Sequence, residues 1–232
     1  MFSACYITCS LVLWIYINIS IASIKPIYTH WPVIYKMACA AECFEGLYTA
    51  KIDPEIAQEA LKEMQVLLDN SGTRRHSTAS EMVEIGACFI SAKQGKHSVV
   101  KHSLCDFPAI MRLITLSMNA LGSVDRDLQE DRLNVIIRRY NVGQGLKMHT
   151  DRTSVHENME ACFEEPVFGC VLENTSPQAL TFKHGAHTLE LQEDVGTVFL
   201  QTGHARFWCQ HGVPLLTAGR RVSLTWRWFV GF

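Results

Sequence analysis

Residues 220–229 read RRVSLTWRWF, and polar and apolar side chains alternate along this stretch. Successive side chains of a β-strand point to opposite faces of its sheet. One face of this strand therefore carries Arg221, Ser223, Thr225 and Arg227. A half-exposed strand with its arginines in water would explain the pattern, and so would a strand whose polar face lines the inside of a barrel. The rest of the chain decides between the two.

Length and composition predict one sizeable domain. The chain has 232 residues, of which 48% are hydrophobic, and its formal net charge is −2. This balance gives no global positive field, so any contact with phosphates must come from a local basic patch. The nine cysteines are scattered and form no CxxC pair, so neither a zinc knuckle nor a disulfide framework is indicated. We expect an intracellular monomer of the nucleus or cytoplasm.

The first 24 residues contain no charged side chain, and Lys25 is the first. That length just reaches what a membrane-spanning helix needs. Embedded Ser, Thr and Asn residues and a second possible start at Met37 instead favour a dispensable extension or a wrongly assigned start. We predict an apolar extension over 1–44, with a membrane anchor at 1–24 as the alternative, and a folded domain over 45–232.

Two amphipathic helices are predicted at the start of this domain, from Pro54 to about Asn70 and from Pro108 to about Leu121. A locally basic stretch between them is expected to hold short strands and loops. Short β-type runs follow, and the strands are predicted at 133–140, 145–149, 167–173, 179–183, 188–192, 196–201, 205–209 and 221–230. Helices followed by many strands indicate an α+β class with a sandwich or jelly-roll core.

The stretch GLKMHTDR places His149 and Asp151 two residues apart at the end of a strand, so both side chains lie on one face. An imidazole and a carboxylate can bind one metal ion, and a third ligand can come from GHARFWCQHGVP at 203–214. Two histidines and one carboxylate form the facial triad of non-haem Fe(II) oxygenases. His211 is the expected third ligand, and His204 is the alternative, although a seven-residue offset puts it on the opposite face of a continuous strand.

The His-x-Asp motif, His211 and Arg221 are more specific as an ordered set than any one of them alone. His211 follows Asp151 by 60 residues, and Arg221 follows ten residues later. With RYNVGQGLKMHTD, HGVP and RVSLTWR, the chain resembles the AlkB-like family of Fe(II)- and 2-oxoglutarate-dependent dioxygenases over about residues 105–230. The resemblance implies a double-stranded β-helix (jelly roll) core, with N-terminal extensions that form a lid for nucleotide recognition.

The resemblance also implies roles for individual residues. Those expected to bind iron are His149, Asp151 and His211, and those expected to bind 2-oxoglutarate are Tyr140, Arg221 and Arg227. The last two are six residues apart, about 20 Å along a strand, so long side chains converging from either end would leave room for a small dicarboxylate. Ser223 and Arg138 stand where the family pattern has asparagines, and they too are expected to bind the co-substrate, with hydrogen bonds that must differ from those of the family.

The activity implied is O2-dependent demethylation of an alkylated base in DNA or RNA, as in DNA repair. A basic cluster before the barrel would contact phosphates, and its members are Arg74, Arg75, Lys93, Lys96 and Lys101. After the His-x-Asp motif the chain has Arg152 and Thr153 in place of the acidic residues with which the repair enzymes read a base. The alternatives are a dioxygenase of the same type acting on a protein or small molecule, and a non-catalytic β-helix binding module.

Overall fold

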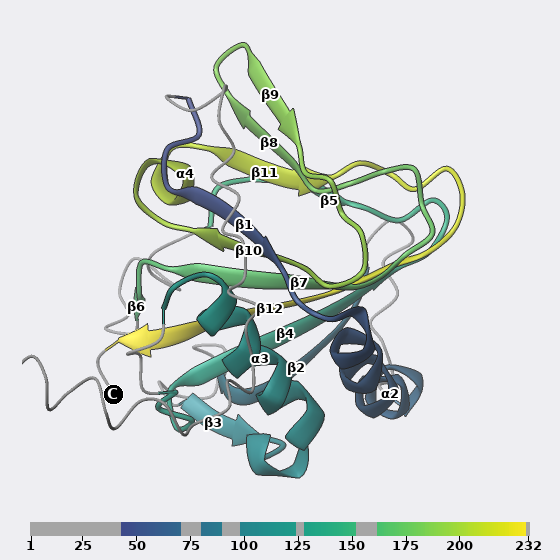
Figure 1. The fold of residues 1–232 in the computed structure, drawn as a ribbon, viewed down its shortest axis with the longest axis vertical. Coiled ribbons are helices and arrows are strands. Elements are labelled where there is room, and N and C mark those ends of the chain that lie inside the picture. The colour runs from purple at the N-terminus through teal and green to yellow at the C-terminus, as the bar shows by residue number, and fades with distance from the viewer. Residues whose placement is uncertain (1–42, 71–79, 90–97, 124–127, 152–161, 231–232) are drawn as a thin grey trace, which may run out of the picture. The chain divides into compact units, whose positions relative to one another are not determined.

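The structure is a computed structural model that describes residues 43–70, 80–89, 98–123, 128–151 and 162–230 (Figure 1). All of them belong to one compact unit, Pro32–Phe232. The predicted extension, the possible anchor at 1–24 and the second start at Met37 lie outside the described residues. None of the helices in the described ranges is long and apolar enough to cross a membrane.

All strand pairs of the larger sheet are antiparallel, and seven of its eight strands follow one another in a single path. Its order is β1 (Leu47–Lys51), β10 (Thr197–Gln201), β7 (Val167–Asn174), β12 (Arg221–Val230), β4 (Leu133–Tyr140), β2 (Glu81–Phe89) and β3 (Ser98–Lys101), with β6 (Cys162–Phe163) added beside β12. The smaller sheet has the order β5 (Leu146–His149), β11 (Gln210–Val213), β8 (Thr181–His184) and β9 (His187–Glu190). The inner faces of the two sheets line a common cavity. This confirms the predicted α+β class with a jelly-roll core.

Strand β12 lies in the middle of the larger sheet, between β7 and β4. Its apolar face is fully buried and packs with two helices, α2 (Pro54–Asn70) and α3 (Pro108–Ala120), in the main hydrophobic core. Trp226 and Trp228 are each 0% exposed there. Burying a large apolar side chain contributes roughly 1.5–3 kcal/mol, so this face of β12 is a main source of stability. The polar face of β12 therefore points into the cavity rather than into water.

The two predicted helices begin where the sequence indicates. Asp53 accepts a hydrogen bond from the backbone N–H of Glu55 at 2.9 Å, which caps the first turn of α2. The carboxylate of Glu63 in α2 accepts the N–H groups of Ala109 and Ile110 at 3.0 and 3.1 Å. Those N–H groups lie in the first turn of α3 and have no partner within the helix, so Glu63 both caps α3 and joins the helices.

The prediction of a strand at 205–209 is wrong. The chain forms a short helix there, α4 (Gly203–Phe207), and Gly203 has a φ of +51°, which ends the extended run of β10. A strand would place Ala205 and Phe207 on one buried face, but Phe207 is 40% exposed and Arg206 is 0% exposed. Strands β1, β6 and β11 were not predicted, because they are short and their side chains do not alternate clearly.

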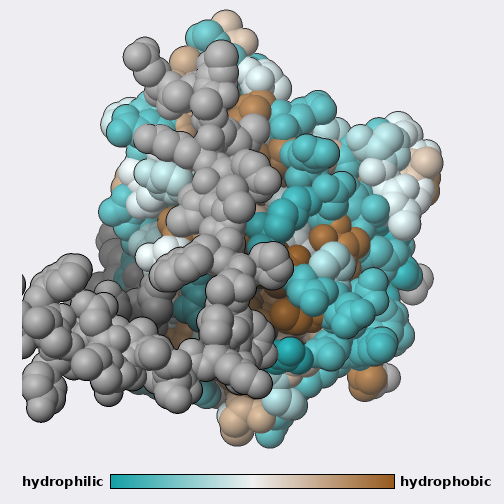
Figure 2. Space-filling model, in the orientation of Figure 1, coloured by the Kyte–Doolittle hydropathy of each residue, from teal (hydrophilic) through white to brown (hydrophobic). Residues whose placement is uncertain are grey.

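The surface and the cysteines agree with a protein that keeps its apolar residues inside. On the face shown in Figure 2 the described residues are mostly hydrophilic, with hydrophobic residues in smaller areas. Within the described ranges no disulfide is present, and the buried cysteines are Cys88, Cys170 and Cys209. Cys105 is exposed, and Cys43 is partly buried.

Candidate metal and co-substrate site

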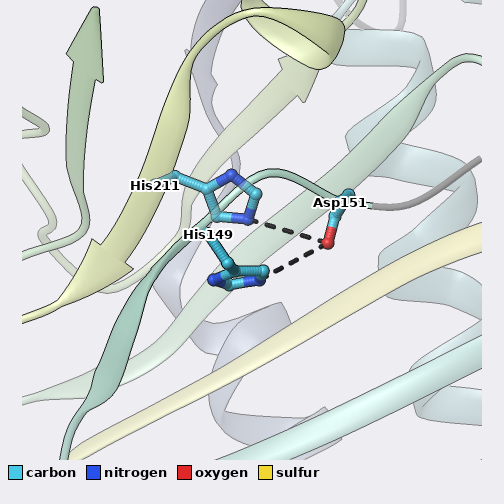
Figure 3. Close-up of side chains that lie close together, drawn as sticks. All are labelled: His149, Asp151 and His211. Carbon is cyan, nitrogen blue, oxygen red and sulfur yellow. Dashed lines mark ion pairs between the residues drawn. The ribbon is translucent and has the colours of Figure 1, made fainter.

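Three potential metal ligands meet where β5 and β11 pair. His149 ends β5 and lies directly opposite His211 of β11, and Asp151 follows two residues after His149. The two imidazoles and the carboxylate point toward one another (Figure 3), and their ligand atoms all lie within 4.8 Å of one another. The Oδ1 atom of Asp151 is 3.5 Å from Nε2 of His149 and 3.9 Å from Nε2 of His211. Among the described residues this is the one such group.

Hydrogen bonds orient both imidazoles for metal binding. Nδ1 of His149 lies 2.8 Å from the carbonyl oxygen of Lys147, which can only accept, so the proton is on Nδ1 and the Nε2 lone pair faces Asp151. Nδ1 of His211 lies 3.5 Å from the side-chain amide of Gln201, which therefore faces the side of the ring away from Asp151. Backbone and amide groups of this kind commonly hold metal-binding histidines in place.

The protonation states suit a cation. Burial lowers the pKa of His211 to about 4, so this imidazole is neutral at physiological pH. Burial alone would raise the pKa of Asp151, but the hydrogen bond with His149 and the charges of Arg227 and Arg206 lower it well below its usual range. The hydrogen bond with Asp151 raises the pKa of His149, so a proton competes for this ligand.

Two neutral imidazole nitrogens and one carboxylate oxygen on one side of a site are the donors that Fe(II) takes in the facial triad. The donor set therefore fits the metal that the resemblance implies. The other side of the group faces the cavity, which leaves room for further ligands.

The cavity has a volume of about 640 Å³, counting the space that opens to solvent. One end holds the three potential ligands, and the inner faces of β4 and β12 supply a polar wall. Residues from these strands that line it are Ile136, Arg138, Tyr140, Arg221, Ser223, Thr225 and Arg227. The structure thus brings all residues expected to bind the metal or the co-substrate to one cavity.

Arg221 lies deep in this cavity and is only 2% exposed. Its Nε and Nη2 atoms donate to the carboxylate of Glu193 at 2.7 and 2.5 Å, and its Nη1 atom donates to the hydroxyl of Ser223 at 2.8 Å. The backbone N–H of Leu180 also donates to Glu193, at 3.0 Å. Tyr140 lies opposite Arg221 across the strand pair, with its ring 5.4 Å from the guanidinium carbon. Arg221 is therefore held in a fixed orientation by a buried partner.

Arg227 lies at the metal end of the same wall. Its Nη1 atom is 3.8 Å from Oδ1 of Asp151, and its guanidinium carbon lies 3.7 Å from the centre of the Phe163 ring. Its Nε atom is buried and has no hydrogen-bond partner within the described ranges. A buried donor without an acceptor is costly, and an anionic ligand next to the metal would satisfy it.

Sequence reasoning missed three side chains of this site. Glu193 pairs with Arg221, Gln201 faces His211, and Arg206 donates to the backbone oxygen of Asp151 at 2.6 Å. Gln201 could have been found, because it follows Phe199 by two residues in a predicted strand and so shares its inward face. Glu193 lies in the connection between β9 and β10, where an acidic residue carries no signal of burial.

Of the remaining expected site residues, the structure describes the surroundings of His204 alone. His204 is not part of the metal group: its ring packs against that of His184 with centres 4.6 Å apart, and its Nδ1 lies 3.8 Å from the Cys209 thiol. The basic residues expected to contact phosphates lie outside the described residues or, for Lys101, in a strand whose side chains are not described; they are Arg74, Arg75, Lys93, Lys96 and Lys101. Arg152 and Thr153 also lie outside the described ranges.

Comparison with solved structures identifies the fold. No family model and no curated protein matches the chain. A prolyl-4-hydroxylase from Pseudomonas putida is similar with a TM-score of 0.53 at 12% identity, over 81% of this chain and 94% of that one. A prolyl hydroxylase from Trichoplax adhaerens, in complex with a peptide fragment of hypoxia inducible factor, is similar with a TM-score of 0.51 at 13% identity, over 79% of this chain and 83% of that one.

A prolyl 4-hydroxylase from Phytophthora capsici is similar with a TM-score of 0.52 at 16% identity, and the match covers 82% of this chain but 60% of that one. Identities this low establish the fold alone. The chain therefore has the jelly-roll fold of these hydroxylases. Its membership of the AlkB-like family in particular stays a prediction.

Proposed function

We propose that this chain is an Fe(II)- and 2-oxoglutarate-dependent dioxygenase that hydroxylates a C–H bond of a peptide or small-molecule substrate. The observation that carries the proposal is the group of His149, Asp151 and His211 in one cavity with the buried Arg221. A non-catalytic binding module would not need both a complete set of metal ligands and a guanidinium held at the far end of the cavity.

Each part of the cavity has a role in this proposal. His149, Asp151 and His211 would hold the metal from one side, and Arg221 would bind the far carboxylate of 2-oxoglutarate through a charge-assisted hydrogen bond. When bound, Fe(II) with 2-oxoglutarate and O2 supplies the oxidation of a substrate C–H bond, with succinate and CO2 as co-products. The protein contributes orientation and the exclusion of water, for which the apolar wall residues Ile136 and Phe199 are placed.

Support for a peptide or small molecule comes from the solved structures with this fold, which are prolyl hydroxylases, one of them with a bound peptide. The net charge of −2 is also no obstacle to such a substrate. Demethylation of a nucleic acid base, the first expectation from the resemblance, has less support, because Arg152 and Thr153 stand where the repair enzymes have acidic residues that read a base.

Succinate formation by the Fe(II)-loaded protein tests the proposal. The arms are proline-containing peptides, methylated single-stranded oligonucleotides, unmethylated oligonucleotides and no substrate, with Asp151→Ala as the inactive control. We expect slow succinate formation without substrate and stimulation by the proline-containing peptides. Stimulation only by methylated strands would replace the peptide reading with base demethylation. Absence of succinate in every arm would overturn the proposal that the chain is a dioxygenase.

A further inference from the structure

Arg138 lies on the inner face of β4, between Ile136 and Tyr140 and opposite Ser223 of β12. Its side chain lines the cavity and is partly buried. Its Nη1 atom donates to the hydroxyl of Ser80 at 3.2 Å. A single neutral acceptor leaves most of the five N–H donors of a guanidinium available.

Arg138 also differs from the other arginines in the part of the chain that the structure describes. Each of the others has a carboxylate oxygen within 4.0 Å; they are Arg112, Arg132, Arg139, Arg206, Arg220, Arg221 and Arg227. Arg138 has no such partner among the described residues. A partly buried positive charge without a counter-charge is costly, so its retention in a cavity points to a ligand that supplies one.

Arg138 shares its cavity with the potential metal ligands. It lines the same cavity as His149, Asp151 and His211, and it stands two residues before Tyr140 on the inner face of β4. A group bound to Arg138 would therefore lie in the cavity that holds the three ligands.

The needs of 2-oxoglutarate can be met by other residues. Three of the five N–H donors of Arg221 are used by Glu193 and Ser223, which leaves two for a carboxylate at the far end of the cavity. Near the metal, the buried Nε of Arg227 lacks an acceptor within the described ranges and could serve the other end of the co-substrate. Arg138 is thus available to bind the substrate rather than the co-substrate.

We propose that Arg138 is a specificity-determining residue that selects substrates with a carboxylate group close to the oxidised carbon. This rests on the proposed function, because it assigns the substrate of the same cavity. A guanidinium pairs with a carboxylate through two parallel hydrogen bonds, and one uncompensated guanidinium matches one singly charged carboxylate. A nucleic acid backbone is bound by several cations at once, whereas Arg138 is the one arginine of the described wall that has no carboxylate oxygen within 4.0 Å.

The test measures binding rather than turnover. Protein loaded with Fe(II) and 2-oxoglutarate without O2 is titrated calorimetrically with N-acetyl-L-proline and with N-acetyl-L-prolinamide, which differ in one charge. The wild type should bind the carboxylate about 10-fold or more tightly than the amide, as expected for a hydrogen-bonded charge pair. Arg138→Gln should remove this preference, Arg138→Lys should retain part of it, and 2-oxoglutarate affinity should stay within about threefold in both.

Arg139→Gln is the matched control, because Arg139 is the next residue on β4, faces the other side and pairs with Glu81 and Asp69. It should leave the preference unchanged. Equal binding of the two probes by the wild type, including no binding of either, overturns the proposal. So does a large loss of 2-oxoglutarate affinity in Arg138→Gln, which would make Arg138 part of the co-substrate site.

A second pair of probes separates carboxylate from phosphate. These are 1-methyl-2′-deoxyadenosine 5′-monophosphate and the corresponding nucleoside, and a preference for the nucleotide over the carboxylate probe would overturn the choice of carboxylate. Because binding is measured without turnover, a failure of this inference is distinct from a failure of the proposed function, which only the absence of succinate would reveal.

Discussion

Replacing Glu193 with alanine should be among the most damaging single changes in the protein. The side chains of Arg221 and Glu193 are 2% and 0% exposed, and two charge-assisted hydrogen bonds join them. Removing one partner of such a buried pair leaves an uncompensated charge and typically costs about 3–5 kcal/mol of unfolding free energy. The lost bond from the Leu180 N–H adds to this cost. Urea denaturation followed by tryptophan fluorescence measures the difference.

Glu173→Ala is the matched control, because Glu173 pairs bidentately with Arg220, whose side chain is 43% exposed. An ion pair that reaches solvent is worth about 0–1 kcal/mol. We also expect millimolar 2-oxoglutarate to raise the unfolding midpoint of Glu193→Ala more than that of the wild type, since its carboxylate can replace the missing partner of Arg221. If Glu193→Ala costs no more than Glu173→Ala, the account of a buried pair that holds Arg221 is wrong.

Three further predictions concern packing and pH. Trp226→Ala should lower the unfolding free energy by about 3–5 kcal/mol in the same denaturation assay, because Trp226 is fully buried in the main core; a cost under about 1 kcal/mol would contradict that burial. Gly169→Ala should lower stability by about 1–3 kcal/mol and weaken 2-oxoglutarate binding in calorimetry, because the added Cβ would lie 2.3 Å from the Phe199 ring that lines the cavity. Unchanged binding would show that Phe199 can move aside without cost to the site. The apparent affinity for Co(II) should rise with pH through and above the ordinary histidine range near about 6.5, because the pKa of His149 is raised and metal binding must displace its proton. An affinity independent of pH there would argue against His149 as a ligand.

The sequence alone predicts the parts of this structure that depend on local patterns. The alternation in β12 correctly placed Trp226 and Arg221 on opposite faces, because strand periodicity is a local property. That the face of Arg221 lines the cavity was expected from the resemblance, since alternation alone also fits a half-exposed strand. The two-residue spacing of His149 and Asp151 placed both on one face for the same reason. Local patterns do not fix the choice of His211 over His204, since this choice depends on the pairing of β11 with β5.

Features that depend on distant contacts could not be predicted. Glu193 meets Arg221 across 28 residues of chain, and nothing in its own neighbourhood indicates a buried acid. The segment that forms α4 reads GHARF, and five residues are too few for the periodicity of a helix to be told from that of a strand. Its form is decided instead by Gly203 and by the carboxylate of Glu165, which accepts hydrogen bonds from the Thr202 hydroxyl and the Gly203 N–H.

The assignment of His149, Asp151 and His211 as the metal centre can be tested by anaerobic titration of the purified protein with Fe(II) in the presence of 2-oxoglutarate. The wild type is compared with Asp151→Ala and His204→Ala. Asp151 belongs to the metal group and His204 does not. Loss of residues that only support metal ligands costs roughly 10–100-fold in affinity, so loss of a ligand should exceed that range. We predict one bound Fe(II) per chain for the wild type and for His204→Ala, and no measurable binding for Asp151→Ala at the same concentrations. Tight binding by Asp151→Ala, or its loss in His204→Ala, would contradict the assignment of the metal centre.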